Sequence, residues 1–150
     1  MQPGFLKLRF SDDGDGTGKL LVEAEVDDYA GKSGAYFNVD RLRRFAAAVG
    51  QFPLPERSEL SISGGFSETR GKPGQEHVGI DVYSIDQRGH VGVQVRMATE
   101  LWNETRSESQ KAAKLEIMTR HEPLAKFSKE LLAVINPAVP EATLEAELLR

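Results

Sequence analysis

The stretch VGIDVYSIDQRGHVGVQVRMA, residues 78–98, is the most informative part of the chain, because its large apolar residues recur at every second position. Alternation of this kind is typical of a β-strand with one buried face. If 78–85 pairs antiparallel with 90–98, Val78 faces Met97, Ile80 faces Val95, Val82 faces Val93, and Ser84 faces Val91. A shift of one residue would separate these pairs, so the sequence specifies the register of a hairpin. In this register Asp81 and Arg96 are diagonal neighbours on the opposite, polar face.

The same period predicts strands outside the hairpin, at 5–10, 20–27, 34–39, 60–66 and 113–118. Gly64 and Gly65 indicate a bulge or a twist within one of them, and the composition of residues 67–76 predicts a loop. The tail ATLEAELLR (142–150) alternates like a strand but consists of fair helix formers. We expect an edge strand there and keep a helix as the alternative.

Two segments change from a period of two to a period of 3.6, which predicts helices. The first begins at Asn38, a suitable N-cap, and ends at Gly50. The second begins near Pro123, a residue that suits a first helical turn, and ends at Asn136 and Pro137. Since each helix has one apolar stripe and each strand one apolar face, they need a shared core. We therefore predict one α+β domain over residues 1–150: a two-layer sandwich in which a mainly antiparallel sheet of six to eight strands has both helices packed on one face.

Composition limits the class of protein. The 150 residues carry a net charge of −4, so the overall field repels nucleic acid and anionic membranes. The chain has no cysteine, which excludes disulfides, thiolate catalysis and cysteine metal sites. The first ten residues, MQPGFLKLRF, lack the pattern of a signal peptide, and no apolar run approaches the ~20 residues of a membrane span. We expect a cytoplasmic protein that binds neither nucleic acid nor a membrane.

Two segments resemble known binding motifs in part. Residues 13–18 (DGDGTG) match the opening of an EF-hand, but position 12 of that motif is Ala24 and the flanks alternate like strands. We expect a hairpin loop and keep calcium binding as the alternative. Gly31, Lys32 and Ser33 match the end of a phosphate-binding loop, yet strand-like residues follow, which predicts a turn before a strand. The three histidines are scattered, so we expect no metal or cofactor; a catalytic triad assembled from distant positions stays open, without a motif to support it.

The polar face of the predicted sheet is the candidate site. Mixed charge interleaved with tyrosine is typical of surfaces that bind proteins. The candidate partner-binding residues are Arg9, Glu25, Tyr36, Asp81, Tyr83, Arg96, Lys114 and Glu116. The alternative is that this face is merely solvated, as one face of an antiparallel sheet commonly is.

Three segments carry a resemblance to a known group of proteins: LRFSDDGDGTGKLLVEAEV (8–26), GAYFNVDRLRRFAAAVGQFPLP (34–55) and HVGVQVRMATELW (90–102). In these segments and in the order of its elements, the chain resembles small bacterial proteins of the WapI-like immunity type. The resemblance implies a cytoplasmic protein that binds and neutralises a toxin domain, and it assigns no site residue.

We therefore expect a non-enzymatic binding protein, whose acidic charge would suit a basic toxin domain. A small-molecule-binding protein or an enzyme, with a pocket between sheet and helices, is the alternative. A homo-oligomer that packs sheet faces together is a third possibility.

Overall fold

The computed structural model describes residues 4–67, 74–103 and 105–147. In this part of the chain eight strands and two α-helices follow one another, with short 3-10 turns at Arg57–Leu60 and Ser107–Ser109. They are β1 (Phe5–Asp12), β2 (Thr17–Val26), β3 (Tyr29–Asn38), α1 (Val39–Ala48), β4 (Ser61–Phe66), β5 (Gln75–Ser84), β6 (His90–Ala98), β7 (Ala112–Arg120), α2 (His121–Ile135) and β8 (Ala142–Glu145).

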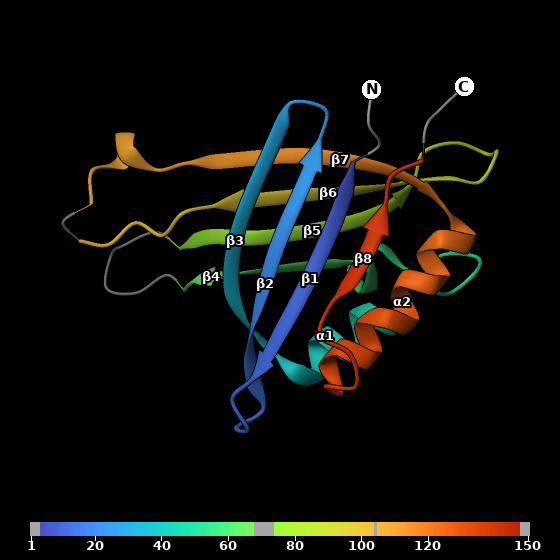
Figure 1. Cartoon of the computed structure of the whole chain (residues 1–150), viewed down its shortest axis with the longest axis horizontal. Coiled ribbons are helices and arrows are strands. Elements are labelled where there is room, and N and C mark those ends of the chain that lie inside the picture. Colours follow the sequence, from blue (N-terminus) through green and yellow to red (C-terminus); the bar gives the residue numbers. More distant parts are fainter. Residues whose placement is uncertain (1–3, 68–73, 104, 148–150) are drawn as a thin grey trace.

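The strands form two four-stranded antiparallel sheets, which Figure 1 shows crossing one another. Sheet A has the order β3-β2-β1-β8 and sheet B has the order β4-β5-β6-β7. The predicted α+β class and the antiparallel pairing are confirmed, whereas the prediction of one sheet is wrong. Alternation defines which side chains share a face of a strand, but it does not define which strands are neighbours. The helix and the proline-containing connector after β3 carry the chain to a second sheet.

Each sheet has an inner face that belongs to the common core and an outer face turned away from it. β3 lies against all four strands of sheet B, while α2 contacts β1 and β8 of sheet A and β7 of sheet B. α1 packs on α2 and contacts β3 and β4. The buried apolar residues of both sheets and both helices form one cluster. The helices therefore contact strands of both sheets, rather than covering one face of a single sheet.

The register of the β5–β6 hairpin is confirmed at each of the four predicted pairs, from Val78 with Met97 to Ser84 with Val91. The predicted bulge is also present, because the pairing of β4 with β5 shifts between Gly64 and Gly65. The tail forms an edge strand, as predicted, over Ala142–Glu145, where it pairs with β1. Residues 148–150 lie outside the described part of the chain.

The helix boundaries follow the sequence signals. Asn38 caps α1, since its side-chain oxygen accepts a hydrogen bond from the Arg41 N–H at 3.0 Å. Pro123 lies in the first turn of α2, which begins at His121. Two local predictions are wrong. Residues 31–33 lie inside β3 instead of forming a turn before it, because the strand begins at Tyr29. Residues 75 and 76, predicted as loop, are the first two residues of β5.

Candidate functional site

The eight candidate residues lie on two separate surfaces. Arg9, Glu25 and Tyr36 are on the outer face of sheet A, in β1, β2 and β3. Asp81, Tyr83, Arg96, Lys114 and Glu116 are on the outer face of sheet B, in β5, β6 and β7. The prediction that they share one face is wrong, since that prediction depended on a single sheet. Only the five residues of sheet B are brought together.

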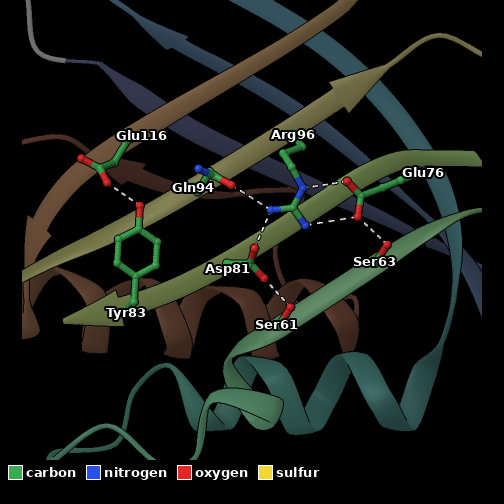
Figure 2. Close-up of polar contacts among 8 residues, drawn as sticks. All are labelled: Ser61, Ser63, Glu76, Asp81, Tyr83, Gln94, Arg96 and Glu116. Carbon is green, nitrogen blue, oxygen red and sulfur yellow. Dashed lines mark hydrogen bonds and ion pairs between the residues drawn. The ribbon is translucent and has the colours of Figure 1, made fainter. Parts of the chain in front are cut away.

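Arg96 is the centre of the polar cluster on sheet B (Figure 2). Its guanidinium donates to both carboxylate oxygens of Glu76, at 2.7 and 3.1 Å, and to Asp81 and Gln94 through Nη1. The two carboxylates are held in turn by hydroxyls of β4: Ser61 donates to Asp81, and Ser63 donates to Glu76. The network therefore joins β4, β5 and β6, and it orients a bidentate arginine, the geometry that makes such pairs strong.

Glu76 is the functional candidate that the sequence pattern does not reveal, because the composition of residues 67–76 predicts a loop. Strict alternation would place it on the inner face with Val78 and Ile80. The register instead passes from Gly64 opposite Val78 to Gly65 opposite Glu76, so that His77 is the extra residue of the bulge. The bulge reverses the alternation and turns Glu76 to the outer face, where it meets Arg96. The Gly64-Gly65 signal is the one feature of the sequence that indicates this change of face.

The ion pairs change the titration of the cluster. The hydrogen bonds from Arg96 lower the pKa of Glu76 below its ordinary value, against a smaller opposing effect of partial burial. At Asp81 partial burial raises the pKa, but hydrogen bonds from Ser61 and Arg96 together outweigh it, so that the pKa is lowered. The pKa of Arg96 is raised, chiefly by Glu76. The cluster is therefore fully ionised at neutral pH.

Two glycines let the polar side chains lie flat on sheet B. Gly79 is opposite Arg96 and Gly92 is opposite Tyr83. A Cβ at Gly79 would lie 2.4 Å from Arg96 Nη2, and a Cβ at Gly92 would lie 2.5 Å from the Tyr83 ring. The Tyr83 hydroxyl donates to Glu116 across β6, and burial followed by this hydrogen bond raises the pKa of Tyr83. Each large side chain covers a glycine of the neighbouring strand, so close contact with the sheet defines its position.

Lys114 differs from the other charged residues of this face. It lies directly opposite Arg96 on β7, and in the described part of the chain its ammonium has no ion pair or hydrogen bond. Beside it is a hollow of about 360 Å³, lined by Glu76, Arg96, Lys114 and the segments 97–98 and 112–113. The hollow extends the polar cluster toward the end of the sheet.

An exposed aromatic side chain follows β6 at the same end of sheet B. Trp102 is 63% exposed, and its ring rests on Phe66 at a centroid distance of 4.8 Å. The backbone around it is fixed, since the Gln75 side chain bonds both the N–H and the carbonyl of Leu101 and the Trp102 N–H donates to Thr105. The ring is therefore both accessible and held in place.

The charged side chains on the outer face of sheet A are more exposed than those on sheet B, and they make fewer hydrogen bonds with one another. Arg9 pairs with Glu141 at 3.2 Å, and the arginine side chain is 59% exposed. Tyr36 is exposed, with the Lys19 ammonium 6.0 Å from its ring centroid, and Glu25 is exposed on β2. A shallow hollow of about 300 Å³ lies over β1, β2 and β3. Glu141 also pairs with Lys7 at 3.5 Å, but among the described residues no side chain of this face is bound by as many partners as Arg96.

The loop that resembles an EF-hand is the turn of the β1–β2 hairpin, as predicted. Its carboxylates bond the loop itself: Asp12 accepts from the Gly14 N–H at 2.8 Å, and Asp15 accepts from the Thr17 hydroxyl at 2.7 Å and from the Thr17 N–H at 3.0 Å. The Thr17 hydroxyl lowers the pKa of Asp15. Across residues 4–67, 74–103 and 105–147, no three histidine or acidic side chains are grouped so as to hold a metal ion.

A histidine network lies at the other end of sheet B. His90 Nδ1 is 2.6 Å from Asp86, and Arg120 donates to His90 Nε2 at 3.1 Å. Arg120 also pairs with Glu147 at 2.8 Å, and the Glu147 N–H donates to the Met118 carbonyl. The hydrogen bond from His90 lowers the pKa of Asp86. This chain of contacts joins the β5–β6 turn to the segment after β8.

No known protein family, curated protein or solved structure matches this chain. The resemblance to immunity proteins therefore remains a prediction, and the case for a function rests on the geometry of sheet B. Among the residues that the structure describes, no helix is long and apolar enough to cross a membrane.

Proposed function

We propose that this chain is a non-enzymatic, immunity-like binding protein that docks a protein partner on the outer face of sheet B. The observation that carries the proposal is the Arg96 cluster, in which one guanidinium is fixed by Glu76, Asp81 and Gln94 on the outer face of sheet B. Side chains that are already ordered lose little conformational entropy on binding, so a pre-formed polar face favours association. The same network also stabilises the fold, since it holds the carboxylates of Glu76 and Asp81 in the ionised form.

The residue types on this face support a protein partner. Tyrosine, tryptophan and arginine supply most of the binding energy in protein interfaces, because they bury a large area with few rotatable bonds. Tyr83 and Arg96 lie on sheet B, and the fixed Trp102 follows the end of β6. Tyr83 and Arg96 thus give the outer face of sheet B both an aromatic ring and a fixed charge.

Charge favours a basic partner. The net charge of −4 would attract a cationic toxin domain and raise the rate of association. The lack of cysteine is compatible with a protein that acts in a reducing cytoplasm, where such a toxin would be neutralised. No chemical step is needed for this function.

A small-molecule-binding protein is the second candidate, and one feature favours it. A groove of about 390 Å³ lies between α2 and β8 and is lined by Pro123, Lys126, Glu130 and residues 143–147. It is a groove at the edge of sheet A, on the side of the sheet that α2 covers. Ligand-dependent stabilisation of the purified protein that Lys126→Gln abolishes would favour this candidate.

Co-expression tests the proposal. The chain is produced together with the product of the neighbouring reading frame, and growth and complex formation are measured. We expect rescue of growth and a complex that co-purifies at equal stoichiometry. Lack of both rescue and complex would overturn the immunity-like function.

A further inference from the structure

We propose that the hollow beside Arg96 receives a carboxylate side chain of the protein partner, with Lys114 as its counter-ion. This inference rests on the proposed function and names one chemical group of the partner. The observations behind it are the hollow of about 360 Å³ and the charged side chains that line it.

The hollow exists because two small residues face one another on the outer side of sheet B. Ala98 of β6 is paired with Ala112 of β7, next to the pair Arg96 and Lys114. The methyl groups form a low floor, while the long side chains of Arg96, Glu76 and Lys114 form walls. The volume is at the lower end of the range for small-ligand sites, which suits one side chain rather than a large ligand.

The charges of the walls select an anion. Glu76 already accepts from Arg96 and Ser63, and Asp81 already accepts from Arg96 and Ser61. Glu116 accepts from Tyr83. These carboxylates already accept from donors of the chain, and the lining itself carries two cations, Arg96 and Lys114, against the one carboxylate of Glu76.

A carboxylate that enters the hollow finds a cation that is still without a counter-ion. The charge of Arg96 is balanced by two carboxylates, whereas Lys114 is a cation without a partner in the described part of the chain. Lys114 lies directly opposite Arg96. A carboxylate beside Lys114 would give its ammonium the counter-ion that Arg96 already has. A single ammonium matches one negative charge, which favours a carboxylate over a phosphate.

Nuclear magnetic resonance titration with two matched peptides tests the inference. The probes are acetyl-Gly-Gly-Glu-Gly-Gly-amide and the same peptide with Gln in place of Glu. We expect saturable shifts of the amide signals of residues 98, 112 and 114 with the Glu peptide, and affinity at least threefold weaker with the Gln peptide. Raising the salt concentration should lower the affinity of the Glu peptide and leave that of the Gln peptide unchanged, because exposed charges are screened.

Three variants separate the effect of the Lys114 charge from the effect of the space above Ala112. Lys114→Gln removes the charge and Ala112→Leu fills the floor, so each should weaken binding of the Glu peptide severalfold. Lys19→Gln removes one cation from sheet A and should leave binding unchanged. Circular dichroism of each variant verifies that it is folded, and Lys114→Gln, at an exposed position, is the variant expected to fold without change.

Equal binding of the two peptides, or unchanged binding to Lys114→Gln, would overturn the inference. These outcomes are distinct from failure of the proposed function. A toxin complex that forms equally well with Lys114→Gln would refute the carboxylate subsite and leave the docking face intact. Peptide binding without any toxin complex would refute the immunity-like function and leave the subsite intact.

Discussion

Arg96 occupies the space above Gly79, its direct partner on the neighbouring strand: a Cβ at position 79 would lie 2.4 Å from Arg96 Nη2 and 2.7 Å from the Glu76 carboxylate. The bidentate ion pair thus depends on a residue that makes no hydrogen bond through a side chain. The glycine is part of the site because it leaves room for the two charged groups.

Gly79→Ala should therefore disrupt the pair of Arg96 with Glu76. We expect a loss of about 1–3 kcal/mol in the free energy of unfolding, because the guanidinium must leave its position. The measurement is urea denaturation, carried out also in an Arg96→Ala background, where the cost should be smaller since the main obstacle is gone. An equal cost in the two backgrounds would show that the glycine serves the backbone alone.

Arg96→Met should be the more costly loss of a single charge. It leaves Glu76 and Asp81, which are about one-third exposed, without their cation, and we expect a loss of about 2 kcal/mol of stability. Arg9→Met is the matched control on sheet A. Its ion pair is more exposed, so its removal should cost less than about 0.5 kcal/mol. Similar losses for the two variants would contradict the central place given to Arg96.

Acid should destabilise the protein through the same cluster. The pKa values of Glu76 and Asp81 in the folded protein are lowered from ordinary values of 4.5 and 3.8. The unfolded chain then binds protons first, so the stabilisation is complete above these ordinary values and is lost as the pH falls through the folded ones. Urea denaturation at a series of pH values measures the slope. The double variant Glu76→Gln/Asp81→Asn should have a smaller slope in acid than the wild type, and an unchanged slope would contradict the assignment.

Calcium should not stabilise the loop between β1 and β2. Asp12 and Asp15 bond the N–H and hydroxyl groups of the loop, and strands instead of helices flank it. We expect the melting temperature to be the same with calcium and with a chelator. Asp15→Ala should lower it under both conditions, because Thr17 then loses its acceptor. A rise on addition of calcium that Asp15→Ala abolishes would show that the loop is a calcium site.

The parts of the structure that could be predicted are those that neighbouring residues determine. The β5–β6 register follows from pairs such as Ile80 with Val95, which one shift would separate. The start of α1 follows from Asn38, whose side chain accepts from the first turn. Local chemistry is sufficient in both cases.

The division into two sheets could not be predicted in the same way. It depends on the contacts of β3 with β4 to β7, and these join residues whose pattern would also suit one continuous sheet. The candidate site was divided for this reason, with Tyr36 on one sheet and Tyr83 on the other. Glu76 was missed because a single extra residue, His77, reverses the alternation on its strand.

The most direct test of the docking face is the dissociation constant of the complex with the neighbouring gene product, measured for matched variants of the two sheets. Tyr83→Ala and Lys114→Glu alter sheet B, while Tyr36→Ala and Arg9→Glu make the same kinds of change on sheet A. We expect each sheet B variant to weaken binding at least tenfold and each sheet A variant to leave it within twofold of the wild type. Loss of affinity for the sheet A variants alone would contradict the account.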